Sequence, residues 1–262
     1  MQIKKQFGIV LLILLGMMAG FPLKGFAFEQ AVEQKFNEAG NHYFNQEYQQ
    51  ALDLYKEIES FGLYNGDLFY NIANCYYQLN EIGNSILYYR KALLYDADDE
   101  DILNNLAMAR EKVTIQIPKH KIPVFFQYLF FPYFKMNMNL LTILSIIFFT
   151  LTFLSLSIFY LKMKQKSLWK FLAMGAAVLG IIFGVALSIQ YNDFVRTQYG
   201  VVIPDSITVY TGPGMNFEKS GDLVSGVEFE VVDLLREEWY QIKLNNGTKG
   251  FVYAQDIGII NE

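Results

Sequence analysis

Few residues in this sequence could carry out covalent or metal chemistry. The chain has one cysteine, Cys75, and two histidines, His42 and His120. A single cysteine excludes an intramolecular disulfide, and two histidines far apart in sequence argue against a histidine-rich metal site. Carboxylates are abundant, but no pair stands out from solvated helix faces. We therefore expect no catalytic residues, no metal and no cofactor, and a protein that is not an enzyme.

Cys75 itself has two readings. It could be a small buried hydrophobe or a reactive thiol, and its place among apolar residues favours burial. The formal charge of −5 and the pI near 5.2 argue against nucleic acid as a partner, because phosphate binding needs a basic surface.

Two uncharged apolar runs, residues 140–161 and 171–189, organise the rest of the chain. Each is long enough to cross a hydrocarbon core of roughly 30 Å as a helix. The loop between them, 162–170, contains four lysines and no acidic residue. The positive-inside rule therefore places this loop in the cytoplasm and both flanking regions on the opposite side of the membrane. The alternative is a buried helical hairpin in a soluble protein.

The second apolar run carries small residues at four-residue spacing, which are Ala176, Gly180, Gly184 and Ser188. Such a stripe lets another helix backbone approach closely. Its partner could be the first run or a helix of another protein.

Residues 1–27 have the order of a secretory signal peptide, with Lys4 and Lys5 before an apolar run and small residues before a cleavage point after Ala27. An uncleaved membrane anchor is the alternative. Either interpretation exports the following segment. Both soluble regions are then expected outside the cytoplasm of a bacterium, in the periplasm, with the hairpin in the inner membrane.

Residues 28–116 repeat with a period of 34 residues, so that Ala39, Ala73 and Ala107 fall in one register and Tyr55 aligns with Tyr89. This period, with small residues on the first helix of each pair, is typical of the tetratricopeptide repeat. The segment Phe69–Tyr77 followed by Ser85–Leu93 resembles that family most closely. About two and a half copies would stack into an α-helical solenoid.

The tetratricopeptide resemblance implies a concave peptide- or protein-binding groove lined by Tyr43, Tyr70, Asn71, Asn74, Tyr77 and Asn105. In peptide-clamping members, the positions of Asn74 and Asn105 hold the backbone of the ligand. The alternative for the asparagines is hydrogen bonding between helices, since buried amides normally pair within the fold. The alternative for the tyrosines is packing.

Two linkers flank the apolar runs, at 117–139 and 190–198. The first contains Val124–Phe134, an aromatic segment that is too short to span a membrane. Aromatic rings suit the headgroup interface of a bilayer, so we expect an interfacial segment. A docking strip for another protein's membrane span is the alternative.

In residues 199–262 apolar and polar residues alternate, and Asn246-Gly247 predicts a tight hairpin turn. The segments Ile207–Pro213, Trp239–Ile242 and Gly250–Val252 resemble the bacterial SH3-like family, which implies a small all-β barrel. Members bind peptides or cell-wall material, so Tyr210, Trp239 and Phe251 are candidate contacts. Each could equally be core or rim packing.

The sequence thus predicts a multidomain membrane protein with a helical repeat solenoid, a two-span hairpin and a C-terminal SH3-like barrel. This order, together with Ile86–Leu93 and Asp99–Ala107, resembles the BatE family of the bacterial aerotolerance operon. The resemblance implies a non-enzymatic scaffold that works with membrane proteins bearing von Willebrand factor A domains and with a MoxR-type ATPase. A cell-wall sensor whose barrel contacts peptidoglycan is the alternative.

Overall fold

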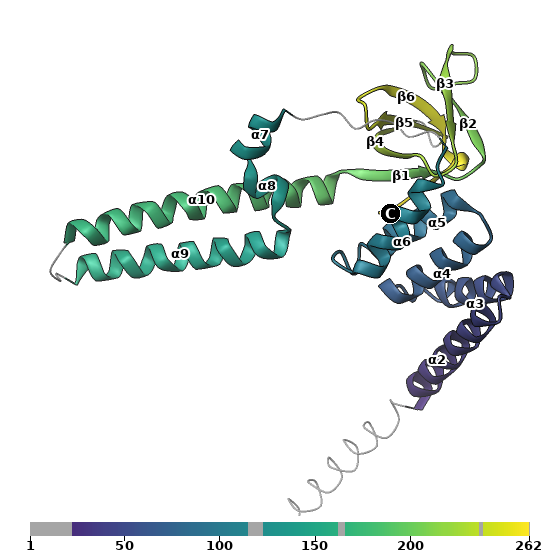
Figure 1. Cartoon of the computed structure of the whole chain (residues 1–262), viewed down its shortest axis with the longest axis horizontal. Coiled ribbons are helices and arrows are strands. Elements are labelled where there is room, and N and C mark those ends of the chain that lie inside the picture. Colours follow the sequence, from purple (N-terminus) through teal and green to yellow (C-terminus); the bar gives the residue numbers. More distant parts are fainter. Residues whose placement is uncertain (1–22, 115–122, 162–165, 236–237, 262) are drawn as a thin grey trace, which may run out of the picture.

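The computed structural model describes residues 23–114, 123–161, 166–235 and 238–261. A helical array, a long helical hairpin and a C-terminal sheet follow one another along the chain, and the array and the sheet lie together at one end of the hairpin (Figure 1). Residues 1–22 lie outside the described residues, so the predicted signal peptide stays a prediction. The same holds for residues 162–165, the first part of the predicted cytoplasmic loop.

The helical array comprises α2 (Leu23–Phe44), α3 (Tyr48–Ser60), α4 (Gly66–Gln78), α5 (Ile82–Ala92) and α6 (Glu100–Glu111). Each helix packs against the next one in sequence. Asn65 and Asp99 begin α4 and α6 by accepting a hydrogen bond from the backbone N–H three residues later. Such caps satisfy amides that have no partner within the helix.

The 34-residue period is visible in the backbone of the turns that join α2 to α3 and α4 to α5. Gln46 and Asn80 occupy equivalent positions and have φ values of 64° and 62°. The N–H of each donates to the carbonyl three residues earlier, on Tyr43 and Tyr77 respectively. The sequence repeat therefore corresponds to a repeated helix–turn–helix geometry.

The small residues of the repeat differ in burial along the array. Ala39 and Ala73 are fully buried, where α3 and α5 pack against the helices that carry them. Ala107 is exposed. In the part of the chain that the structure describes, no second helix follows α6 to complete a pair, so this position has no such cover.

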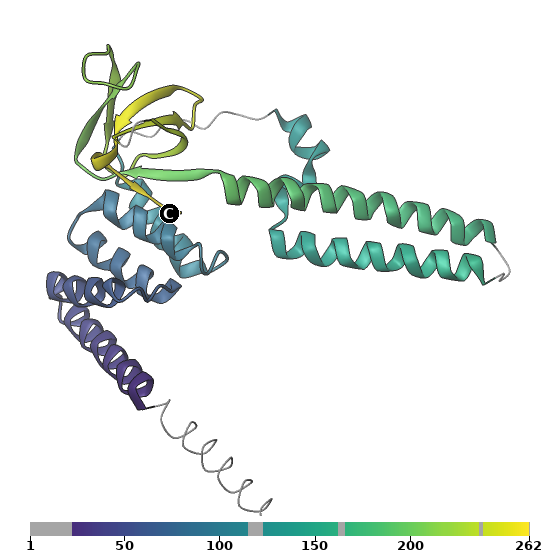
Figure 2. The same cartoon turned by 180° about the vertical axis from the view of Figure 1, so that it is seen from behind.

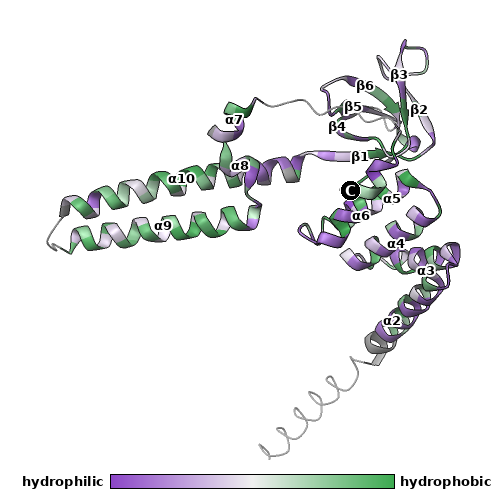
Figure 3. Ribbon diagram, in the orientation of Figure 1, coloured by the Kyte–Doolittle hydropathy of each residue, from purple (hydrophilic) through white to green (hydrophobic). Residues whose placement is uncertain are grey.

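The hairpin consists of α9 (Met138–Tyr160) and α10 (Lys166–Arg196), which lie side by side (Figure 1). Among the described residues, two segments are long and apolar enough to cross a membrane, Met138–Tyr160 and Ser167–Asp193. Both helices are predominantly hydrophobic, whereas α10 becomes hydrophilic where it approaches the sheet (Figure 3).

The predicted linker at 190–198 is wrong. Helix α10 continues to Arg196, and strand β1 begins at Gln198. The residues after Ile189 are mostly polar but include no proline or glycine before Gly200, so nothing in the backbone ends the helix at Ile189. Only Thr197 separates the apolar helix from the sheet.

The small-residue stripe lies partly at the contact between the two long helices. A Cβ on Gly180 would lie 3.6 Å from Phe148 and from the backbone of Phe149, and one on Gly184 would lie 3.8 Å from the Phe149 ring. Ala176 is half-buried, but Ser188 is exposed. Gly180 and Gly184 therefore allow the close approach of α9, while Ser188 lies outside this contact.

Two short helices, α7 (Val124–Leu129) and α8 (Phe131–Lys135), occupy the aromatic part of the predicted first linker. Helix α8 packs against α10, and α7 lies on the side of α10 that faces away from α9 (Figure 1).

The C-terminal β-domain, residues 198–261, is an antiparallel sheet with strand order β3-β2-β6-β5-β4-β1-β7. The strands are β1 (Gln198–Val202), β2 (Ser206–Tyr210), β3 (Lys219–Val224), β4 (Glu228–Leu235), β5 (Trp239–Leu244), β6 (Lys249–Tyr253) and β7 (Ile257–Ile259), with a short 3-10 helix at Ala254–Asp256. The sheet curls around a core that includes Phe229, Ile242 and Val252 (Figure 2). The predicted hairpin turn at Asn246-Gly247 is confirmed, since it joins β5 to β6.

Candidate binding surfaces

Three of the predicted groove residues meet in one hydrogen-bond network. The Asn105 side-chain amide donates to Tyr70 Oη at 3.0 Å and to Asn74 Oδ1 at 3.1 Å. Asn74 Oδ1 also accepts a bond from Tyr89 Oη at 2.5 Å. Burial raises the pKa of Tyr89, so its hydroxyl stays protonated and donates.

This network joins α4, α5 and α6. Both amide protons of Asn105 have acceptors within the fold, and Asn74 Oδ1 has two donors. An amide used in this way is not free to hold the backbone of a peptide without breaking an internal bond. The geometry thus corresponds to helix–helix hydrogen bonding, the alternative interpretation of these asparagines.

The other predicted groove residues lie apart from that network. Tyr43 accepts a long hydrogen bond of 3.4 Å from Gln78 Nε2, and its ring packs against Tyr48. The Lys112 ammonium lies 3.8 Å from the centre of the Tyr77 ring. Asn71 is half-buried. These side chains leave a mixed aromatic and cationic surface on the array.

Cys75 is fully buried in the core of the array. Burial raises the pKa of its thiol to about 12, because the apolar surroundings disfavour the thiolate. A thiol that stays protonated at neutral pH is a poor nucleophile.

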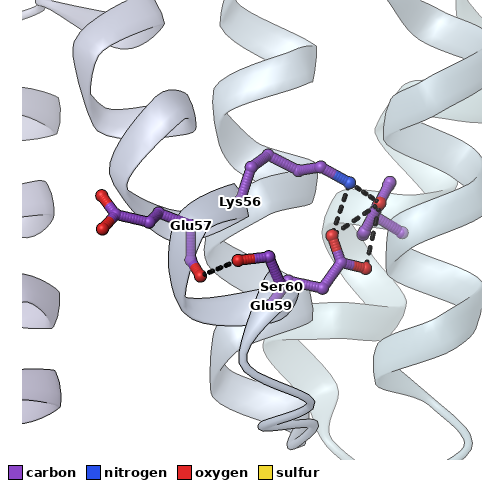
Figure 4. A network of polar contacts seen from close by, with 5 residues as sticks. Lys56, Glu57, Glu59 and Ser60 are labelled. Carbon is purple, nitrogen blue, oxygen red and sulfur yellow. Dashed lines mark hydrogen bonds and ion pairs between the residues drawn. The ribbon is translucent and has the colours of Figure 1, made fainter.

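A second aromatic cluster of the array, which includes residues of α4 and α5, was missed from the sequence. Tyr64 stacks on Phe69, which also contacts Tyr88 and Tyr95, beside a cavity of about 190 Å³. Behind them, Lys56 and Glu59 point toward a common partner (Figure 4), since Lys56 Nζ donates to both Glu59 and Tyr88, and Tyr88 Oη donates to Glu59 at 3.1 Å. Burial, and after it the Glu59 carboxylate, raise the pKa of Tyr88. Aromatic residues at helical spacing are usual in a packed helical array, so the sequence did not distinguish this cluster from ordinary core residues.

The candidate contacts of the β-domain lie close together. Tyr210 pairs with Phe251 across strands β2 and β6. Trp239 is only 8% exposed and lies edge-on between Tyr210 and Tyr253, with ring centres 5.5 and 5.6 Å apart. Trp239 therefore supports the surface from below, and the half-buried Tyr210 and Phe251 are the residues that can contact a ligand.

The loop between β2 and β3 follows Tyr210 directly in the chain and carries two further apolar side chains. Gly212 is required there, because a Cβ would lie 2.3 Å from the ring of Phe217. Met215 and Phe217 are both exposed. Together, Tyr210, Met215, Phe217 and Phe251 form what we call the aromatic face.

The β-domain and the helical array share a hydrophobic core. Val201 and Ile260 belong to the same buried cluster as Ile86 and Leu87 of α5. The Gly83 N–H donates to Ser225 Oγ at 3.1 Å, and a Cβ on Gly83 would lie 2.4 Å from the Val202 carbonyl oxygen. Backbone of α5 thus lies directly against backbone of the β-domain.

An ion pair also connects the helical array to the β-domain at this interface. Glu228 on β4 accepts from Arg110 of α6 through both carboxylate oxygens, at 2.6 and 2.8 Å, and Arg90 of α5 lies 3.4 Å from it. Beside the interface is a cleft of about 280 Å³ lined mainly by polar residues, which are Asn80, Glu81, Asn84, Lys112, Asp205 and Ser225. In the part of the chain that the structure describes, no three histidine, cysteine or acidic side chains are grouped so that they could hold a metal ion.

Comparison with known families identifies the β-domain. Residues 205–258 match the family described as the bacterial SH3 domain. This segment is therefore similar to a bacterial SH3 domain, and we refer to it as the SH3 domain. No curated protein matches the chain.

The residues that match the family, 205–258, do not cover the whole β-domain. Strand β1 and residues Ile259–Ile260 lie outside 205–258. These are also the elements that pack on α5 and that connect to α10. The added strand therefore joins the SH3 domain to both the helical array and the hairpin.

Proposed function

We propose that this protein is a non-enzymatic, membrane-anchored adaptor that presents its helical array and SH3 domain as one rigid unit outside the cytoplasm. The observation that carries the proposal is the shared core of α5, β1 and Ile260, with only Thr197 between β1 and the apolar helix α10. Because the two domains are fixed to each other and to a proposed membrane helix, we expect the protein to hold partners together and not to convert a substrate.

The proposal takes the array to be a tetratricopeptide repeat. The equivalent turns at Gln46 and Asn80, one period of 34 residues apart, support this assignment. The resemblance to the BatE family suggests partners among membrane proteins with von Willebrand factor A domains and a MoxR-type ATPase system, in an aerotolerance or envelope-stress complex.

The proposed partner site is the aromatic face of the SH3 domain. Tyr210 is partly exposed against Trp239, Phe251 is partly exposed on the neighbouring strand, and Met215 and Phe217 are exposed on the loop that follows Tyr210. Aromatic side chains bring large contact area at low conformational-entropy cost. On the array, Tyr43, Asn71 and Tyr77 are proposed as a second contact, because the amides of Asn74 and Asn105 are already paired.

Peptidoglycan is the second candidate ligand, and the match to the bacterial SH3 domain favours it, since domains of this kind bind cell-wall material. In this alternative, the SH3 domain binds the cell wall and the helical array supports the SH3 domain.

Two assays on the full-length chain separate these functions. A photo-crosslinking amino acid is placed at Phe251 in native membranes, with exposed Leu103 of the array, which lies in none of the candidate surfaces, as the control position. In parallel, the detergent-purified chain and its Phe251→Ala variant are sedimented with peptidoglycan sacculi. A protein adduct specific to position 251 supports the adaptor. Sedimentation with sacculi that Phe251→Ala abolishes, without any protein adduct, would replace it with wall binding.

A further inference from the structure

Helices α7 and α8 expose an unusual density of aromatic side chains. Phe125 and Tyr128 are 70% and 78% exposed, and Phe126, Phe130 and Phe131 are exposed as well. Five exposed aromatic rings within seven residues form an apolar surface that water solvates poorly, and such surfaces mark interaction sites. We call these five residues the aromatic anchor.

The aromatic anchor is held in place by the hairpin. Gln190 Nε2 of α10 donates to the backbone carbonyls of Tyr133 and Met136, at 2.6 and 2.8 Å. Tyr133 Oη donates to Asp193 Oδ2 at 2.7 Å. Helix α8 is therefore fixed to one position along α10 and does not hang on a free linker.

That position is the boundary where the apolar helices end. Gln190 directly follows the last residue of the uncharged run, and α9 begins at Met138, two residues after the carbonyl that Gln190 binds. In a bilayer crossed by α9 and α10, this level is the interface between hydrocarbon and headgroups. Aromatic residues are enriched at that depth, because their rings contact both phases.

We propose that the aromatic anchor lies in the headgroup region of the bilayer, on the side that carries the soluble domains. This inference rests on the proposed membrane insertion of α9 and α10. Lipid is the expected occupant because α8 packs against α10 where the apolar run of that helix ends, so in the proposed bilayer the exposed rings face lipid before they face a partner protein. The anchor lies next to another link, since Asn137 at the start of α9 donates to Asp98 of the array at 3.2 Å. The anchor thereby holds the soluble unit close to the membrane surface.

Depth-dependent quenching in lipid vesicles tests this proposal on the full-length chain. Single cysteines are introduced in a Cys75→Ala background and labelled with a polarity-sensitive fluorophore. Phe125→Cys and Tyr128→Cys report on the anchor, and Leu151→Cys reports on the middle of α9. The matched control is Phe44→Cys, which replaces an aromatic residue that is 86% exposed at the end of α2. Nitroxides are placed either on the lipid headgroup or deep in the acyl chain.

We expect both anchor probes to be quenched at least twofold more by the headgroup nitroxide than by the deep one, with the order reversed at position 151 and no lipid quenching at position 44. If position 151 is quenched deeply while both anchor probes behave like position 44, the anchor proposal is overturned and the membrane insertion stands. If position 151 is not quenched either, both the anchor and the proposed insertion fail.

Discussion

Asn105 shows how a residue on a predicted binding face can be used within the fold. Its side-chain amide donates to Tyr70 and Asn74, whereas Asn104, its neighbour on α6, is exposed. We expect Asn105→Ala to lower the free energy of unfolding by about 1–3 kcal/mol, because it removes the donor to Tyr70 Oη and one of the two donors to Asn74 Oδ1. Asn104→Ala is the matched control and should change it by less than about 0.5 kcal/mol.

Urea unfolding of the detergent-solubilised chain, followed by circular dichroism, measures both variants. Equal stability of the two variants would contradict the structural role of Asn105 and would favour a role in ligand binding.

Cys75 gives a second test at the scale of single residues. Its pKa is raised to about 12 by burial, so the thiolate is scarce in the folded chain at pH 8 and becomes more abundant on unfolding. Above pH 9, the folded chain keeps the thiol proton while the unfolded chain releases it. The stability that this group contributes is therefore lost as pH rises above the unfolded pKa of 9.0.

We expect iodoacetamide to alkylate Cys75 at pH 8 more than tenfold faster in urea than in the native chain, as measured by mass spectrometry. Rapid alkylation without urea would indicate a reactive, accessible thiol.

At the scale of elements, the contact between α5 and the SH3 domain depends on Gly83. A Cβ there would collide with the backbone of Val202, whereas one on Gly66, in the first turn of α4, would meet nothing closer than 3.6 Å. We expect Gly83→Ala to destabilise the chain by about 1–3 kcal/mol, and Gly66→Ala to be neutral or stabilising by up to about 1 kcal/mol. Thermal unfolding followed by the fluorescence of Trp239, in a Trp169→Phe background, compares them. A Gly83→Ala chain as stable as the Gly66→Ala chain would show that the two domains do not touch at this point.

Glu228 tests the same interface through charge. Its side chain is 19% exposed and forms ion pairs with Arg110 and Arg90, whereas Glu230 pairs with Lys243 at a more exposed position. We predict that Glu228→Gln costs about 1–3 kcal/mol of stability and Glu230→Gln less than about 1 kcal/mol, since exposed pairs contribute little. A double-mutant cycle of Glu228→Gln with Arg110→Gln, measured by urea unfolding, isolates the pair. Additive single effects would exclude a coupled contact.

Local patterns predicted the elements but not how they meet. Alternation and the Asn246-Gly247 pair located strands of the SH3 domain, and the two uncharged runs located α9 and α10. The bond between Arg110 and Glu228 joins residues 118 positions apart, and no periodicity in the sequence signals such a contact. The end of the apolar run was mistaken for the end of α10, because hydropathy records burial in lipid and the helical backbone continues without it.

At the scale of the whole molecule, α2–α6 and the SH3 domain form one unit at one end of the hairpin. The proposed membrane arrangement agrees with this contact, because a chain that crosses a bilayer twice returns to the side from which it started. Strand β1 belongs to that unit and follows α10 almost directly in the chain, so the position of α10 fixes the position of the unit. The contacts among Arg90, Arg110 and Glu228 therefore require both domains in the same compartment.

The most direct test of this arrangement labels single cysteines with a membrane-impermeant maleimide in sealed vesicles of known orientation. Asn104→Cys reports on the array, Met215→Cys on the SH3 domain and Ser167→Cys on the loop end of α10, each with Cys75→Ala. We predict that positions 104 and 215 are labelled from the outer side of the native membrane, and position 167 only from the cytoplasmic side. Labelling of positions 104 and 215 from opposite sides would contradict the shared core and the adaptor built on it.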